Sequence, residues 1–206
     1  MPKLILPKPH LSWSQLSCWE TNPVRYRREY FECGKKLDTK YLRFGKGVAE
    51  LIEKGLHKEL IPDLVVYDTP EFEIKTTVNE VPILAYLDSY NSKENVFREY
   101  KTGTVAWDMA RVIKHGQLPF YAVALKHKLG KTPEYCDLDW IETKLGRSES
   151  EVDDFWRENE NVVNVTGRLL TFHRQFSDYE IEKMEDRIVK VAEEISEAYQ
   201  LFLKEI

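Results

Sequence analysis

The sequence predicts an α/β domain in which a central mixed β-sheet is flanked by helices and followed by a long carboxy-terminal helix. Three patterns indicate this fold: alternation of apolar and charged residues over 71–78, two more extended stretches joined by a polar connection, and apolar residues spaced three and four apart after residue 177. Strand patterns interleaved with helical ones are typical of mixed α/β domains and exclude a repeat protein. A length of 206 residues suits one domain, so we expect a single domain over residues 1–206.

The first part of the chain, residues 12–60, is expected to be helical. Ser12 or Ser14 offers a cap for a first helix, which is bent or restarted at Pro23. A second helix over about 41–58 has a mostly apolar face.

The middle part, residues 71–176, carries the strands of the predicted sheet. Two of its stretches, 82–90 and 95–102, are separated by the polar connection Asn91-Ser92-Lys93-Glu94, which suits a hairpin. The other expected elements are a strand over 71–78, helices over 106–113 and 117–129, strands over 134–142 and 167–176, and an exposed acidic helix or loop over 146–160.

The last part, residues 177–206, is predicted to be one long helix. It begins with a capping box, Ser177-Asp178-Tyr179-Glu180. Its apolar positions are Ile181, Met184, Ile188, Val191, Ile195, Ala198 and Phe202. This heptad-like pattern fits either a coiled-coil seam or a helix laid across its own domain, and we favour the second.

Composition narrows the class of protein. With 42% hydrophobic and 12% aromatic residues, the chain can build a core, which excludes wholesale disorder. No apolar run is long enough to span a membrane, and the apolar stretch near the amino terminus is too short for a signal peptide. We therefore expect a cytoplasmic protein without a membrane partner.

Cysteine, histidine and charge patterns exclude some sites and leave others open. Three cysteines without a CxxC pair do not predict a disulfide framework or a four-thiolate site, and the five histidines show no metal-ligand spacing. The net charge is −5, but residues 1–60 hold 12 Lys and Arg against 7 Asp and Glu. This basic front suits either a solvated surface or a track for nucleic-acid phosphates.

The predicted hairpin gathers residues that could carry chemistry. Because strand side chains alternate, Glu99 and Lys101 share a face. If Tyr90 pairs with Asn95, Asp88 lies diagonal to Glu99 on that face, at about 7–8 Å, where two carboxylates can share one hard cation. A register shifted by one residue would send the two acids to opposite faces.

Two carboxylates and an amine suit hydrolysis of a phosphodiester. A divalent cation held by Asp88 and Glu99 would neutralise the phosphate and acidify a bound water, and Lys101 would stabilise the resulting hydroxide. Gln117 and Tyr121, four residues apart on one helix face, could present a polar pair toward the hairpin. On spacing alone, a salt bridge within the hairpin remains the alternative.

The order of these motifs resembles a known superfamily. The succession AYLDSY, EYKTG and QLPFY is similar to the PD-(D/E)XK nucleases, in particular their RecB-like exonuclease branch. The opening SWSQLSCWETNPVRYRREYF and the segment FGKGVAELIE resemble the first helices of that branch. The resemblance runs from about residue 12 to residue 125, and it implies a restriction-endonuclease-like core.

The resemblance also implies roles for individual residues. Asp88 and Glu99 would ligate Mg²⁺ or Mn²⁺, Lys101 would be the catalytic lysine, and Gln117 and Tyr121 would form the auxiliary motif beside it.

Two positions depart from the pattern of the branch. Where it has a histidine ligand, this chain has Ala49, and either Glu50 or Glu53 could serve instead; we expect Glu50. Asn22-Pro23 stands where some members have Cys-Pro, so no iron–sulfur cluster is expected.

The resulting hypothesis is a divalent-metal-dependent DNA nuclease. It would be an exonuclease in recombination, repair or phage replication, in the cytoplasm of a bacterial or phage-infected cell. Ser14, Arg25 and Arg27 would contact DNA phosphates, and a homo-oligomer or a recombination or replication partner would be compatible with this role. Two alternatives remain: a catalytically degenerate DNA- or protein-binding module, favoured by Ala49, and a scaffold that dimerises through its heptad helix.

Overall fold

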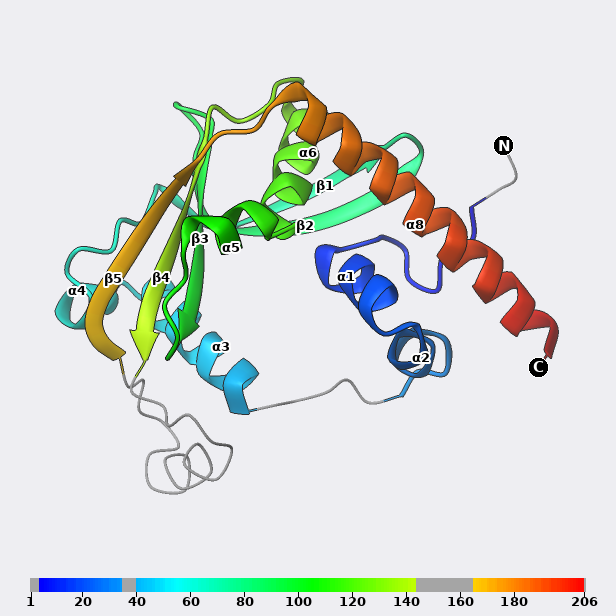
Figure 1. The fold of residues 1–206 in the computed structure, drawn as a ribbon, viewed down its shortest axis with the longest axis horizontal. Coiled ribbons are helices and arrows are strands. Elements are labelled where there is room, and N and C mark those ends of the chain that lie inside the picture. Colours follow the sequence, from blue (N-terminus) through cyan, green and yellow to red (C-terminus); the bar gives the residue numbers. More distant parts are fainter. Residues whose placement is uncertain (1–3, 35–39, 144–164, 206) are drawn as a thin grey trace.

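The computed structural model describes residues 4–34, 40–143 and 165–205 (Figure 1). The predicted acidic segment 146–160 therefore lies outside the described residues. The helices are α1 (Trp13–Thr21), α2 (Pro23–Tyr26), the π-helix η1 (Arg27–Phe31), α3 (Lys40–Glu53), α4 (His57–Leu60), α5 (Met109–Lys114), α6 (Gln117–Leu129) and α8 (Asp178–Glu205). The strands are β1 (Thr69–Val78), β2 (Val81–Asn91), β3 (Val96–Gly103), β4 (Cys136–Thr143) and β5 (Val165–Arg174).

The five strands form one mixed sheet in the order β1-β2-β3-β4-β5. All neighbouring pairs are antiparallel except β3 and β4, which are parallel. Parallel neighbours need a crossover connection, which α5 and α6 provide between β3 and β4. This arrangement confirms the predicted α/β class with a central mixed sheet.

Helices cover both faces of the sheet. On one face α6 packs across β1 and β2, and α8 packs on α6 and on α1 (Figure 1). The side chain of Trp140 belongs to this larger core, whereas the next residue, Ile141, joins Val48 and Ile52 of α3 in a smaller one. Because successive strand residues point to opposite faces, α3 covers the face opposite α6.

The long helix α8 lies against its own chain, as favoured. Its capping box is formed in both directions: the Ser177 N–H donates to Glu180 Oε2 at 3.0 Å, and the Glu180 N–H donates to Ser177 Oγ at 3.3 Å. The positions Ile181, Met184, Ile188, Val191 and Ile195 are all buried in the larger core. The apolar seam is thus used within the molecule, which removes the argument for a coiled-coil dimer.

Of the first two expected helices, one is as predicted and the other is shorter. The first is restarted at Pro23, as predicted, where the side chain of Asn22 accepts a hydrogen bond from the Arg25 N–H at 2.9 Å and caps α2. The second ends at Glu53 instead of residue 58, because Gly55 adopts a left-handed conformation with φ of 71°. Within the described residues, no helix combines the length and apolar character that crossing a membrane requires.

Candidate active site

The strands β2 and β3 separate after a short stretch of pairing. They are paired only from Ser89 to Asn91 on β2 and from Val96 to Arg98 on β3. Near the beginning of β2, the edge that β3 does not reach is paired with Leu11, whose N–H donates to the Pro82 carbonyl at 2.8 Å. The sheet therefore opens into a fork between β2 and β3.

Asp88 stands where this fork opens. Its Oδ2 accepts a hydrogen bond from the Tyr100 N–H at 2.6 Å, so the side chain replaces a backbone acceptor of the ladder. This bond holds the Asp88 carboxylate beside the strand that carries Glu99 and Lys101.

The hairpin register differs from the predicted one by two residues. Tyr90 pairs with Phe97, not with Asn95. The connection begins one residue later than expected, because the Asn91 side chain accepts the Lys93 and Glu94 N–H groups and Asn95 takes a left-handed φ of 54°. A shift by two keeps every side chain on its face, so the expected convergence of the two acids survives the error.

Four predicted residues form one hydrogen-bonded chain. The Lys101 ammonium donates to Glu99 Oε1 at 2.5 Å and to Gln117 Oε1 at 2.9 Å. The Gln117 amide donates in turn to the Tyr121 hydroxyl at 2.6 Å. Gln117 is the first residue of α6 and Tyr121 lies one turn later, so the start of α6 buttresses the lysine of β3.

The two acids are held in an environment that disfavours their charges. Glu99 is only 2% exposed, and burial raises its pKa to about 8, with a further contribution from the neighbouring Asp88 carboxylate. Burial also raises the pKa of Asp88. Glu99 Oε2 is buried and has no hydrogen-bond partner in the part of the chain that the structure describes.

These observations fit a divalent cation between the two acids. A cation would supply a positive charge that compensates both carboxylates, and it would be a partner for Glu99 Oε2, which has none among the described residues. Among the described residues, no group of three or more His, Cys, Asp or Glu is arranged to hold a metal by itself. Mg²⁺ does not need such a group, since it is commonly held by one or two carboxylates with water and substrate phosphate as its other ligands.

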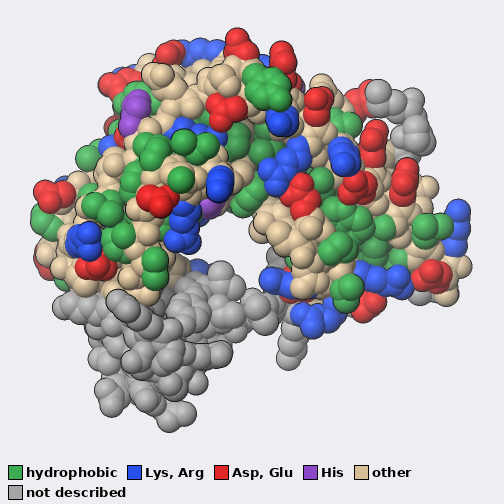
Figure 2. Space-filling model, viewed as in Figure 1, with side chains coloured by type: hydrophobic (Ala, Val, Ile, Leu, Met, Phe, Trp, Pro, Cys, Tyr) green, Lys and Arg blue, Asp and Glu red, His purple; other side chains and the backbone are tan. Residues whose placement is uncertain are grey.

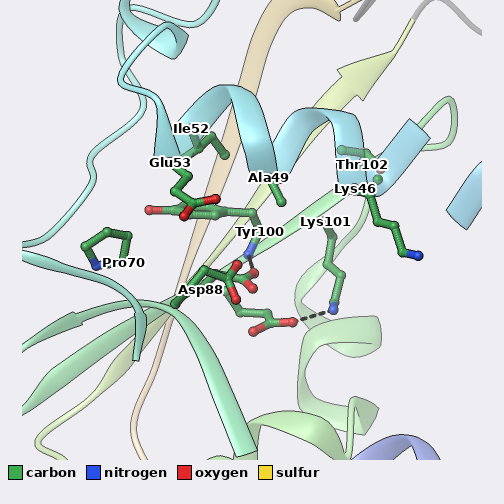
Figure 3. A pocket seen from close by; sticks show the side chains of 12 residues that line it. Lys46, Ala49, Ile52, Glu53, Pro70, Asp88, Tyr100, Lys101 and Thr102 are labelled. Atoms are coloured by element: carbon green, nitrogen blue, oxygen red, sulfur yellow. Dashed lines mark hydrogen bonds and ion pairs between the residues drawn. The ribbon is translucent and has the colours of Figure 1, made fainter. Parts of the chain in front are cut away.

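Asp88, Glu99 and Lys101 line a cavity of about 430 Å³ between α3 and the fork. Two more acids line it, Glu53 of α3 and Glu71 of β1. Figure 3 shows Glu53 and Ala49 on the side of α3 that faces Asp88.

Glu50, the expected third acid of the metal site, lies outside the cavity, which corrects the prediction. Its carboxylate points to solvent and pairs with Lys54 at 3.5 Å, and it does not line the cavity. Each helical residue is rotated by about 100° from the last, so Ala49 and Glu53, four apart, share a face that Glu50 does not. Helical periodicity therefore favours Glu53, the other acid that the sequence offers for this role.

Glu71 was not singled out from the sequence. Its neighbours Pro70 and Phe72 pair with Ser89 and Leu87, so Glu71 falls opposite Asp88. Its backbone takes a left-handed φ of 48°, and burial and the nearby Asp88 raise its pKa. In an ideal strand Glu71 would share a face with other exposed charges, so no sequence pattern indicated this position.

The three residues predicted to contact DNA are placed differently from one another. Ser14 lines a second cavity, of about 350 Å³, whose wall also includes Gln117 and Tyr121. Arg25 is paired with Glu29 at 2.7 Å, and Arg27 is paired with Glu205 at 3.0 Å. Neither arginine lines either cavity.

Comparison with solved structures identifies the fold. An alkaline exonuclease of Laribacter hongkongensis matches with a TM-score of 0.53 and 14% identity, over 95% of this chain and 92% of that one. The same protein in complex with dAMP matches with a TM-score of 0.52 and 12% identity over the same shares. A candidate exonuclease of Eubacterium rectale matches with a TM-score of 0.53 and 10% identity, over 90% of this chain and 82% of that one.

These likenesses confirm the predicted α/β fold, a central mixed sheet flanked by helices, which the chain shares with these exonuclease structures. No protein-family model matches the sequence, and a comparison with curated proteins finds no relative. At such low identity the solved structures establish the shared fold alone.

Proposed function

We propose that this protein is a divalent-metal-dependent DNA nuclease that acts as an exonuclease with Mg²⁺ or Mn²⁺. The observation that carries the proposal is the pair of buried carboxylates, Asp88 and Glu99, at the fork beside Lys101. A buried acid with an unpartnered oxygen is costly, and it is expected where a cation binds.

The residues of the chain have distinct roles in this proposal. When bound, the cation would neutralise the phosphodiester and lower the pKa of a water molecule. Lys101 uses two N–H groups on Glu99 and Gln117, which leaves one to hold and orient the attacking water. Gln117 fixes the lysine, and Tyr121 fixes Gln117. Glu53, on the facing helix, is the proposed additional acid of the metal site in place of Glu50.

Three features support DNA as the substrate. Two of the similar structures are of an alkaline exonuclease, one of them in complex with dAMP. The second cavity, which contains Ser14, shares its Gln117–Tyr121 wall with the catalytic network, so a polynucleotide could occupy both sides of that wall. Figure 2 shows an opening between the sheet and the part that carries α1 and α2, with Lys and Arg side chains along its edges.

The wider setting is part of the proposal. Action in recombination, repair or phage replication, in the cytoplasm, with a homo-oligomer or a partner protein, would suit such an enzyme. Three cysteines cannot supply the four thiolates of an iron–sulfur cluster, so none is included.

The test is incubation of end-labelled linear DNA and closed circular DNA with Mg²⁺ or Mn²⁺. We expect degradation of the linear DNA only, and a loss of roughly 10²–10⁴-fold in Lys101→Ala. Glu99→Ala should be inactive. Glu50→Gln should match the wild type, because Glu50 lies on α3, as Glu53 does, but outside the cavity. Activity that survives in the Glu99→Ala, Lys101→Ala double variant would discard this site, and cleavage of circles would make the enzyme an endonuclease.

A second candidate is a degenerate module that binds DNA without cutting it. Ala49 favours it, because this cavity-lining position offers no ligand atom. A module without a metal site should show no rise in melting temperature with Mn²⁺. The nuclease should show a rise that Asp88→Asn removes.

A further inference from the structure

Lys46 is a cation of the active-site cavity to which no role has been given. It lies in the first half of α3, is exposed, and lines the cavity together with Lys101. Figure 3 shows Lys46 and Lys101 on one side of the cavity, away from Glu53 and Pro70. Within the described part of the chain no carboxylate pairs with Lys46, and Glu50, four residues later, pairs with Lys54 instead.

The start of α3 is held close to the catalytic strand. A Cβ at Gly45 would meet Thr102 Oγ1 at 4.0 Å, so the helix backbone approaches β3 at the residue just before Lys46. The backbone that carries Lys46 therefore lies beside Thr102 at the edge of the cavity, and in Figure 3 the Lys46 ammonium points away from the carboxylates.

The charges of the cavity leave a specific need. Four carboxylates (Glu53, Glu71, Asp88 and Glu99) and two amines (Lys46 and Lys101) line it. One divalent cation would bring the sum to zero, so each DNA phosphate that enters adds an uncompensated negative charge. Lys101 is committed to Glu99 and Gln117, whereas Lys46, with three N–H groups, has no hydrogen bond or ion pair to any residue that the structure describes.

We propose that Lys46 binds a DNA phosphate at the mouth of the cavity and so positions the strand for cleavage. This inference rests on the proposed nuclease function. A single lysine–phosphate contact adds affinity without base preference and releases about one counterion, so it contributes about one unit to the salt dependence of binding.

The experiment compares Lys46→Ala with Lys54→Ala, a matched exposed lysine close by in the chain whose partner Glu50 lies outside the cavity. The dissociation constant of a labelled DNA oligonucleotide is measured with Ca²⁺ at several salt concentrations, and cleavage kinetics are measured with Mg²⁺. We expect Lys46→Ala to weaken binding roughly fivefold, to lower the salt slope by about 0.7–0.9, and to raise KM with kcat unchanged. Lys46→Arg should restore the dissociation constant, the salt slope and KM, and Lys54→Ala should match the wild type.

The outcomes separate the two levels of the proposal. If the wild-type protein neither binds nor cuts DNA, the proposed function fails. If the wild type does both, and Lys46→Ala keeps the salt slope and KM of Lys54→Ala, the inference about Lys46 is wrong. A fall in kcat at unchanged KM would also overturn it, because the contact would then be made only in the transition state.

Discussion

Two clusters of buried charge lie on opposite faces of β3. One is built around Arg98 and the other contains Glu99, the next residue of the strand. Arg98 donates to Asp139 at 2.7 Å and pairs with Asp137 at 2.9 Å, while Thr171 and His173 bind the other oxygens of these two acids. Every carboxylate oxygen of this Arg98 cluster therefore has a partner, and the buried atom of the cluster without a partner among the described residues, Arg98 Nε, belongs to the cation. In the Asp88–Glu99 pair, by contrast, Glu99 Oε2 has none within the described chain.

The comparison teaches that the pairing of the acids, more than their burial, distinguishes a site from a structural network. Burial raises the pKa of Asp139 just as it raises those of Asp88 and Glu99. The shift alone therefore does not tell the clusters apart. An acid left incompletely paired is a cost to folding that a bound cation can offset.

The largest expected effect on stability comes from breaking the Arg98 cluster. Asp139→Asn removes one charge and leaves Arg98 buried with only Asp137 as its acid. We expect the free energy of unfolding to fall by about 3–5 kcal/mol, measured by urea denaturation. Folded protein at low temperature should retain its nuclease activity. A loss of activity without a loss of stability would contradict the assignment of this cluster to structure.

Glu99→Gln should have the opposite effect from Asp139→Asn, a loss of nuclease activity without a loss of stability. Below about pH 8 the Glu99 carboxyl keeps its proton in the metal-free fold. Gln is then a neutral replacement of similar shape that keeps an oxygen for Lys101, so we expect metal-free stability to stay within about 1 kcal/mol of the wild type. Nuclease activity should nevertheless be lost. A destabilisation as large as that of Asp139→Asn would show that the Asp88–Glu99 pair is also structural.

The last expected effect, small over any single pH unit, is a pH dependence of metal-free stability. The folded-state pKa of Glu99 is about 8, against an ordinary value of 4.5. Between these values the folded state keeps a proton that the unfolded state has released. Stability from this group is therefore fully present below about pH 4.5 and is lost as the pH rises toward 8, by at most ~1.4 kcal/mol per pH unit.

Urea titrations of the metal-free protein at a series of pH values measure this slope. Glu99→Gln should flatten the slope, whereas Glu50→Gln, at an exposed position, should leave it as it is. An unchanged slope in Glu99→Gln would show that another group carries it.

Much of the site could be predicted because it depends on local periodicity. Glu99 and Lys101 share a face in any register, and Gln117 and Tyr121 share a helix face wherever the helix packs. The same reasoning identifies Glu53 as the acid in line with Ala49, although Glu50 was preferred.

The rest depends on contacts between distant parts of the chain. At the fork Leu11 pairs with the edge of β2 that β3 leaves, and no local sequence pattern predicts this pairing. Glu71 reaches the cavity through a left-handed backbone within a strand, which alternation cannot foresee. Arg25 and Arg27 are both paired with acids, and the partner of Arg27, Glu205, lies at the far end of the chain, where no local pattern indicates it.

The central claim is that Asp88 and Glu99 together bind a divalent cation, and calorimetric titration with Mn²⁺ tests it most directly. We expect saturable binding by the wild type and by Glu50→Gln, and at least about tenfold weaker binding by Asp88→Asn and by Glu99→Gln. Wild-type affinity for Mn²⁺ in both of the latter variants would contradict the claim.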